Sequence, residues 1–440
     1  MDHETVKVAE PSPDSWPARA KKHAGTLLEW LVLGALVGVA CGVASAIFLF
    51  ALDHATRFRE AHEGIVYALP VAGLVVGALY DRFGKPIKGG NNLVIDTVHE
   101  DSPQIPLRMG PMVLAGTVLT HLFGGSAGRE GTAVQMGASL ADLVAHRWKA
   151  QKETRRRLLA AGIAGGFGSV FGTPIAGAVF GLEVVSVGRM EYDALFPALV
   201  AALVGDLVTR GLGVVHTAYP APAALDLTPI LLGKWAVFAL AVALTSIAFV
   251  ELTHRLKKVL ERRVPSVPLR MAAGGLAVVA LWRLVGTSDY LGLGVPMILR
   301  SFTDPSLPLH AFALKLLFTS VTLASGFLGG EVTPLFFVGA TLGNALGRAL
   351  GIPIGLAAGV GLAALFAAAA NTPLALSIMA IELLGAGVIP HVAIVAVLAY
   401  LLSGHRGIYP AQRLFRKKSG ERLPRAIALR DYPARNDEKP

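Results

Sequence analysis

Residues 123–142, FGGSAGREGTAVQMGASLAD, bring a glycine cluster and one glutamate, Glu130, to the start of an apolar helix. Glycine permits tight backbone bends and leaves amide N–H groups uncovered. The first turn of a helix also carries unpaired N–H donors and a partial positive charge. The stretch therefore has the outline of an anion site. Glycine also lets membrane helices approach closely, so a helix-packing corner is the alternative interpretation.

The composition of the chain places this stretch in a membrane protein. The 440 residues are 53% hydrophobic and 16% charged, with a mean hydropathy of +0.57, which is too apolar for an ordinary soluble protein. Nearly uncharged stretches recur along the chain. In residues 158–188, for example, Glu183 is the only charged residue. Backbone groups in lipid must bond internally, so the spans are predicted to be helices. The 49 glycines and 26 prolines predict that many of them are broken or tilted, as in helices that line substrate cavities.

The net charge of +10 fits membrane topology better than nucleic-acid binding, because the basic residues gather in short loops and tails between apolar segments. The single cysteine, Cys41, can form no disulfide within the chain. Residues 1–24 are polar and basic, and no cleavage site is evident after the long span that follows. They are predicted to be an uncleaved cytoplasmic tail rather than a signal peptide.

Three landmarks recur in the same order in two halves of the chain. They are TPIAGAVFGLE at 173–183 and TPLALSIMAIE at 372–382 (372 − 173 = 199), GREGT at 128–132 and GGEVT at 329–333 (331 − 130 = 201), and, more weakly, Gly90 and Gly292 (292 − 90 = 202). Three matches that arose by chance would seldom have such similar sequence distances between their two copies. The pattern predicts a duplication.

Charge gives the relative orientation of the halves. Residues 146–157 include six Lys or Arg and one acidic residue, whereas the equivalent residues 347–356 include only Arg348. Residues 254–263 are likewise strongly basic, while their counterparts 53–63 are mixed. By the positive-inside rule, equivalent loops lie on opposite sides of the membrane, so the repeat is inverted. Inverted repeats place substrate sites near the midplane, between half-helix ends.

The predicted fold is therefore an all-α polytopic membrane protein with two inverted-topology helical repeats and many tilted and broken helices. The predicted repeats cover residues 25–224 and 225–412, and a cytoplasmic tail covers residues 413–440.

Residues 30–412 resemble the CLC chloride channels and anion/proton antiporters. In that family G-S-G-I-P, G-R-E-G-P and G-x-F-x-P motifs and a late tyrosine surround an anion pathway. The corresponding stretches here are GNNLV at 90–94, GREGT at 128–132, GEVTP at 330–334, and Tyr409. Asn91 replaces the chloride-coordinating serine and the third motif contains Glu331, which is similar to the fluoride-exporting branch. Val184 stands where chloride/proton antiporters have an inner proton glutamate, so protons are expected to use another route. The resemblance also implies a homodimer.

Glu130 is predicted to be the gate and the proton carrier. Its carboxylate and the transported anion would compete for the same N–H donors, and protonation would release the side chain from the anion site. The alternative is a carboxylate that caps its own helix or pairs with Arg129. Glu331 is the predicted second, coupling acid, with a helix cap as the alternative.

A fluoride site must replace tightly held water with strong donors at short range. The predicted anion-binding residues are Asn91, Gly128, Arg129, Gly131, Val332, Thr333 and Tyr409. Asn92 is a rival to Asn91, turn formation is the alternative for both asparagines, and interfacial anchoring is the alternative for Tyr409. Glu183 and Glu382, each nine residues beyond a matching proline, are expected to bond exposed backbone N–H groups.

We therefore predict a secondary active transporter that exchanges cytoplasmic fluoride for external protons. It would lie in a bacterial-type inner membrane with both termini cytoplasmic. A chloride/proton antiporter or chloride channel is the nearest alternative. An intramembrane enzyme that uses Glu130 and Glu331 lacks an accompanying nucleophile, and a non-transporting scaffold would leave two buried acids without a purpose. No sequence pattern indicates a metal or cofactor, since H-E-x-x-H and Cys/His spacings are absent from the sequence.

Overall fold

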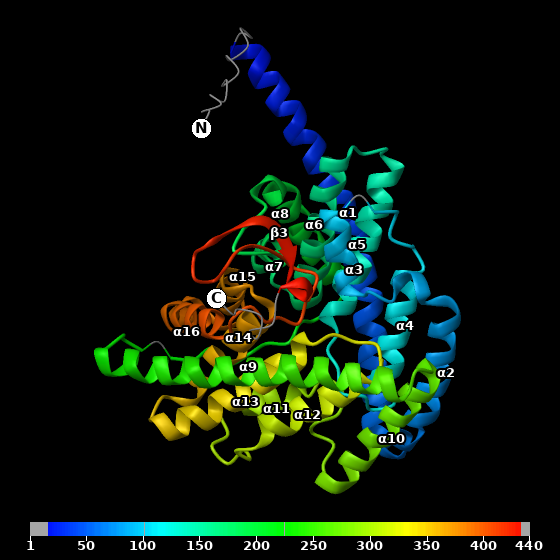
Figure 1. Cartoon of the computed structure of the whole chain (residues 1–440). Helices are drawn as coiled ribbons and strands as arrows, with labels where there is room; N and C mark the ends of the chain where they lie inside the picture. Colours follow the sequence, from blue (N-terminus) through cyan, green and yellow to red (C-terminus); the bar gives the residue numbers. More distant parts are fainter. Residues whose placement is uncertain (1–15, 101, 224, 433–440) are drawn as a thin grey trace.

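The computed structural model describes residues 16–100, 102–223 and 225–432, which are mainly helical (Figure 1). The helices are α1 (Trp16–Ala61), α2 (Leu69–Phe83), α3 (Asn91–His99), α4 (Met109–Leu122), α5 (Glu130–Arg147), α6 (Lys152–Phe171), α7 (Pro174–Glu183), α8 (Leu195–Gly211), α9 (Pro229–Arg263), α10 (Val267–Val285), α11 (Val295–Arg300), α12 (Ala311–Ala324), α13 (Val332–Leu350), α14 (Ile354–Ala370), α15 (Pro373–Leu384) and α16 (Ile389–Leu402). The strands are β1 (Ser186–Val187), β2 (Arg413–Arg416) and β3 (Arg422–Ala428).

The two halves use the same helix-packing devices. A Cβ atom on Gly137 of α5 would lie 2.2 Å from the carbonyl oxygen of Gly162 on α6. In the second half, a Cβ atom on Gly339 of α13 would lie 2.2 Å from the carbonyl oxygen of Gly361 on α14. Only glycine permits these close helix crossings. The predicted class, an all-helical membrane protein built of two repeats, is confirmed.

Among the described residues, five helical segments are long and apolar enough to cross a bilayer, and several shorter apolar helices accompany them. The predicted breaks lie at equivalent places in the two halves. Gly172, in the left-handed conformation (φ 74°), ends α6, and Pro174 starts α7. Asn371 (φ 58°) and Pro373 do the same between α14 and α15. A left-handed residue stops a helix and proline suits the first helical position, so both breaks are encoded locally.

Glu183 and Glu382 cap each other's helices. The carboxylate of Glu183, at the end of α7, accepts hydrogen bonds from the first N–H groups of α15, at Leu374 (3.2 Å) and Ala375 (2.8 Å). Glu382 on α15 accepts the equivalent bonds from α7, at 3.0 Å and 2.7 Å. This is the backbone bonding expected for the two glutamates, and it joins the two halves.

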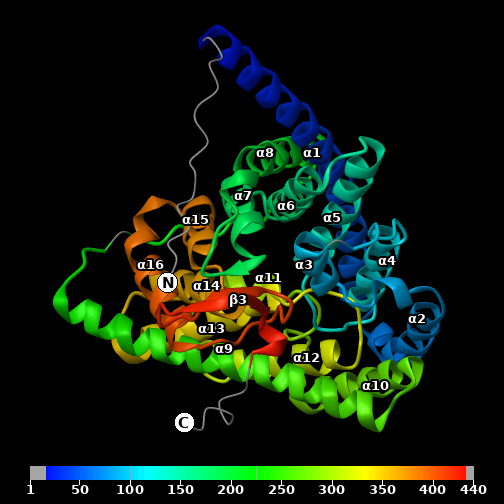
Figure 2. The same cartoon turned by 45° about the horizontal axis from the view of Figure 1, so that its top comes forward.

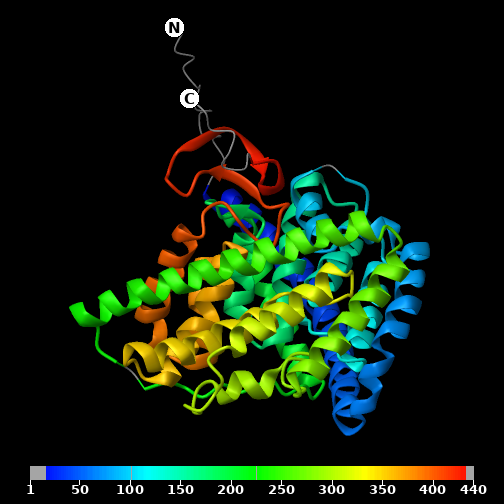
Figure 3. The same ribbon diagram turned by 60° about the horizontal axis from the view of Figure 1, so that its bottom comes forward.

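The C-terminal segment, residues 413–440, is the stretch predicted as a cytoplasmic tail. Its described part, residues 413–432, contains β2 and β3, and β2 pairs in parallel with β1 and antiparallel with β3. The strands lie on one face of the helical body (Figure 3). At the other end, helix α1 begins at Trp16, inside the segment predicted as the N-terminal tail; the remaining tail residues, 1–15 and 433–440, lie outside the described residues.

Candidate functional site

The glycine motifs of the two halves meet at a backbone bridge. The N–H of Gly128 donates to the carbonyl of Gly330 (2.6 Å), and the N–H of Gly330 donates to the carbonyl of Gly128 (2.8 Å). A Cβ atom on Gly128 would lie 2.9 Å from the Gly330 oxygen, and one on Gly330 would lie 2.8 Å from the nitrogen of Gly131. Glycine at both positions therefore allows the starts of α5 and α13 to converge.

The Glu130 carboxylate is fully buried at this convergence. Its Oε2 accepts hydrogen bonds from the backbone N–H groups of Arg129 and Thr333, both at 3.1 Å. The Thr333 hydroxyl donates to Oε1, which also lies 3.5 Å from Nε of Arg129. Since α13 supplies two of these donors, Glu130 does more than cap its own helix or pair with Arg129. A free anion in the same place would meet the same donors.

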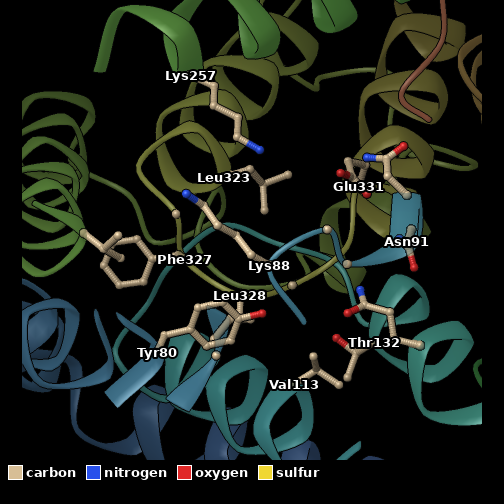
Figure 4. A pocket seen from close by; sticks show the side chains of 18 of the residues that line it. Tyr80, Lys88, Asn91, Val113, Thr132, Lys257, Leu323, Phe327, Leu328 and Glu331 are labelled. Carbon is tan, nitrogen blue, oxygen red and sulfur yellow. The ribbon is translucent and has the colours of Figure 1, made fainter. Parts of the chain in front are cut away.

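A cavity of about 390 Å³, here called the inner cavity, lies beside this site. It is lined among others by Asn91, Thr132, Gln135, Glu331 and Tyr409. Figure 4 shows Asn91 and Glu331 next to each other on one wall. The structure thus brings together residues that are more than 300 positions apart in the sequence.

Asn91 and Asn92, the first two residues of α3, have different surroundings. A Cβ atom on Gly131 would lie only 2.9 Å from the amide nitrogen of Asn91, so this amide faces the start of α5. Its Oδ1 is buried and has no hydrogen-bond partner among the described residues. Asn92 also borders the inner cavity, but its Oδ1 accepts a hydrogen bond from the N–H of Ala411 (3.0 Å). Asn91 is therefore the better placed of the two for an anion.

Glu331, Val332 and Thr333 form the start of α13. Glu331 is its N-cap residue, yet its side chain makes no capping hydrogen bond, and Oε2 is buried without a partner in the described part of the chain. The helix-cap interpretation of Glu331 is therefore not supported. Val332 and Thr333 are buried. Tyr409 is 4% exposed and lines the inner cavity, which does not fit an anchor at the membrane interface.

A second cavity of about 390 Å³, the outer cavity, has Arg129 in its wall, together with Asp53, Arg57 and His216. Glu130 lines neither cavity, although its neighbour Arg129 lines the outer one and Thr132 the inner one. The buried carboxylate therefore lies next to residues that line both cavities.

Two lysines of the inner cavity were missed as site residues. Lys88 precedes the first glycine motif, and Lys257 lies near the end of α9, in the basic stretch that the sequence identifies only as a topology signal. Figure 4 shows both amino groups pointing into the cavity. Neither makes a hydrogen bond or ion pair with another described residue. Basic residues at this cavity (Lys85, Lys88, Lys257 and Arg270) outnumber the acidic ones (Asp81, Glu261 and Glu331), which favours an anion there.

Comparisons with known proteins identify the family and the fold of the chain. A family model described as "Voltage gated chloride channel" matches residues 72–404. A "Chloride/fluoride channel protein" of Pseudomonas syringae pv. tomato is 50% identical over 416 residues, which cover 92% of this chain and 91% of the relative. The crystal structure of a CLC-type fluoride/proton antiporter superposes with a TM-score of 0.86 at 37% identity, covering 88% of this chain and 98% of that one. A slow cyanobacterial Cl⁻/H⁺ antiporter (TM-score 0.75, 20% identity, 85% and 94% coverage) shares the fold.

Proposed function

Because the chain belongs to the voltage gated chloride channel family, we propose that it is a transporter that exchanges cytoplasmic fluoride for external protons. The observation that carries the proposal is the Glu130 carboxylate, buried next to residues that line both cavities and held by donors from both halves. Fluoride appears in the descriptions of both the Pseudomonas relative and the antiporter at 37% identity, which supports the choice of anion.

Glu130 acts as the gate. Its carboxylate competes with fluoride for the N–H groups of Arg129 and Thr333 and for the Thr333 hydroxyl. Hydrogen bonds to a charged acceptor are about twice as strong as those to a neutral one, so protonation weakens the hold on the side chain. The protonated side chain leaves and the anion takes its place. Anion movement and proton movement are thereby linked at one residue.

Glu331 is the coupling acid on the cytoplasmic side. Val184 leaves no carboxylate at the position that the resemblance assigns to inner proton transfer. Glu331 is buried beside the inner cavity with an unpartnered oxygen and stands at the equivalent place to Glu130 in the second half. An intramembrane carboxylate of this kind is a candidate proton site by default.

Asn91 and Tyr409 select fluoride. Both line the inner cavity, and each offers a strong neutral donor that replaces part of the water shell of a small anion. Gly128 and Gly131 allow the backbone to approach, and Val332 lies at the start of α13 beside Thr333.

Both termini are cytoplasmic, in a bacterial inner membrane. The support is that the basic end of α9 and the turn after β3 share a face: Lys257, Lys258 and Arg430 line one cavity there. An exposed cysteine at Ser419, in a Cys41→Ala background, should react with a membrane-impermeant maleimide only from the cytoplasmic side. Labelling from the outside would reverse the assignment. Family membership is the basis for a homodimer, and mass photometry of the purified protein tests it.

The test of the function is flux in liposomes. Purified protein should release trapped fluoride much faster than chloride, and an inward proton gradient should drive fluoride out against its own gradient. Equal fluoride and chloride efflux would contradict the selectivity and favour the chloride alternative. Fluoride movement that no proton gradient can drive would contradict the antiport.

A further inference from the structure

The C-terminal segment, taken from here on to begin at Tyr409 (residues 409–432), is tied directly to α3, the helix that contains Asn91. Asn92 Oδ1 accepts a hydrogen bond from the N–H of Ala411 at 3.0 Å. Asn92 directly follows Asn91, and Ala411 lies two residues after Tyr409. This hydrogen bond therefore joins the immediate neighbours of the two residues proposed to select fluoride.

Asp96 makes a second tie, one turn further along α3. Its Oδ2 lies 2.9 Å from Nη1 of Arg430, and its Oδ1 lies 3.1 Å from Nη2 of the same guanidinium. Oδ1 also accepts from Nη2 of Arg413 at 3.2 Å. The Arg430 contact is bidentate, the geometry that gives arginine–carboxylate pairs their directional strength. The side chains of Asp96 and Arg413 are only 20% and 12% exposed, so solvent screens their pair less than an open surface pair.

The C-terminal segment provides a firm support for these ties. Gln412 is fully buried, and its amide donates to the carbonyls of Val184 (2.9 Å) in the first half and Ala370 (2.8 Å) in the second. Its Oε1 accepts from the amide of Asn371 at 3.0 Å. Pairing of β2 with β1 and β3 adds further backbone bonds. In Figure 2 the red C-terminal strands extend across α13 and α14 towards α3.

Helix α3 is short, and besides its buried Val94, Ile95 and Val98 it is held by side-chain contacts, such as that of His99 with the carbonyl of Val185 (2.9 Å). It has nine residues, and its N-cap residue, Gly90, has no side chain with which to cap the helix. Helices this short are marginal without tertiary contacts. The position of Asn91 therefore depends on what holds α3 against its neighbours.

We propose that Asn92 and Asp96 are positioning residues for fluoride selectivity. Together they hold α3 against the C-terminal segment, so that the Asn91 amide and the Tyr409 hydroxyl keep the close spacing that a small anion requires. Functional groups must be held within about 0.5 Å of the productive geometry, and outer contacts usually provide this precision. When α3 is released, the two donors separate and the site accepts the larger chloride. The inference rests on the proposed function.

The test compares fluoride and chloride efflux from liposomes for the full-length protein and four variants. Asp96→Asn and Asn92→Ala each remove one tie. Asp96→Glu retains the carboxylate, and Glu421→Gln is the matched control, because Glu421 pairs with Lys417 inside the same C-terminal segment and not with α3. We expect Asp96→Asn and Asn92→Ala to lower the fluoride-to-chloride ratio about tenfold, the low end of what loss of an outer-shell partner costs at other ion sites. Asp96→Glu and Glu421→Gln should stay close to the wild-type ratio.

Two results would overturn the inference. If Asp96→Asn and Asn92→Ala slow both anions equally and leave the ratio unchanged, the contacts serve only stability. If Glu421→Gln lowers the ratio as much as Asp96→Asn, the effect does not come from α3. Should Asp96→Asn fail to give monodisperse protein, Arg430→Gln, which removes the bidentate partner from the more exposed side, takes its place. A wild-type protein without fluoride preference would instead contradict the proposed function.

Discussion

Thr333, near the start of α13, donates both its backbone N–H and its hydroxyl to the carboxylate of Glu130, which lies 203 residues earlier at the start of α5. The second half of the chain thus holds the proposed gate of the first half. Release of Glu130 requires that both bonds break together. Protonation weakens both, since each depends on a charged acceptor.

Replacing Glu130 by glutamine should abolish proton coupling. Glutamine has nearly the same shape but cannot carry a proton, so fluoride efflux should no longer acidify or alkalinise the liposome interior in step with anion movement. The number of protons moved per fluoride, measured with a pH dye and a fluoride electrode, should fall at least about tenfold. The control is Glu29→Gln, because Glu29 is exposed and lies outside the inner cavity. Unchanged coupled exchange would remove Glu130 from the mechanism.

Replacing Asn91 by alanine should lower the preference for fluoride over chloride. A hydrogen bond to a charged partner contributes about 1.5–3 kcal/mol, which corresponds to tenfold or more in relative affinity. Asn91→Ser should raise chloride flux further, because the resemblance assigns a chloride-coordinating serine to this position. The measurement is the ratio of initial efflux rates. A ratio that both variants leave intact would transfer the role to Asn92 or the backbone.

Removing either of the glutamates that cap each other's helices, Glu183 or Glu382, should destabilise the protein. Glu183→Ala leaves the N–H groups of Leu374 and Ala375 without their acceptor, at a cost of about 2–3 kcal/mol. Glu382→Ala has the same effect on α7, with a smaller loss because Glu382 is less buried. Thermal unfolding in detergent measures both against exposed Glu29→Ala. If the folded Glu183→Ala protein keeps its stability but loses proton coupling, this glutamate has a transport role instead.

Neutralising Lys257 should slow fluoride capture from the cytoplasmic side. At low ionic strength, we expect Lys257→Gln to reduce the initial rate roughly threefold, and Lys88→Gln to act in the same direction, because clustered charge raises the local anion concentration. The difference should shrink at high salt, where the charges are screened. Lys234→Gln, at the opposite end of α9 where the lysine bonds to Gly351, is the matched control. A salt-independent loss of rate would point to a different role for Lys257.

The stability of the C-terminal segment should depend on pH through Lys418. Its Nζ donates to the carbonyl of Tyr400 (2.6 Å), and burial lowers the pKa of the Lys418 ammonium to about 7. An unfolded lysine has a pKa of about 10.4, so between these values the unfolded state binds more protons and stability rises with pH. Lys418→Met should flatten the rise in melting temperature between pH 7 and pH 10, whereas exposed Lys258→Met should not. Parallel profiles for wild type and Lys418→Met would contradict the shift.

The fold class and the family were predictable because their signals are local or periodic. The two glycine and glutamate motifs, the matched proline breaks and the asymmetry of basic loops can each be identified without any knowledge of contacts. They led to the correct family. The exchanged bonds of Glu183 and Glu382 were also predictable in kind, since both glutamates follow matching prolines at the same distance.

Contacts between distant segments could not be predicted. Strand β1 has only two residues, too short to be identified from the sequence, and its pairing with β2 decides their conformation. Asn91 and Asn92 are identical in type, and only contacts with distant segments separate their surroundings: the Asn91 amide faces Gly131, whereas Asn92 accepts from Ala411. In the sequence, Lys257 is one of several basic residues near a helix end. Its place at the inner cavity depends on residues of the first half that form the opposite wall. The roles of the site residues remain predictions that the variants above test.

The bridge between Gly128 and Gly330 limits how this molecule can move. Two short backbone hydrogen bonds join the halves at the depth of the site, and the exchanged caps join them again between α7 and α15. Many transporters with inverted repeats open by rocking one half against the other. Here that motion would break both connections, so the scaffold is expected to stay still while single side chains swing. Cross-linking the halves to each other should then leave turnover almost unchanged, because transport would need only side-chain movements within a fixed backbone.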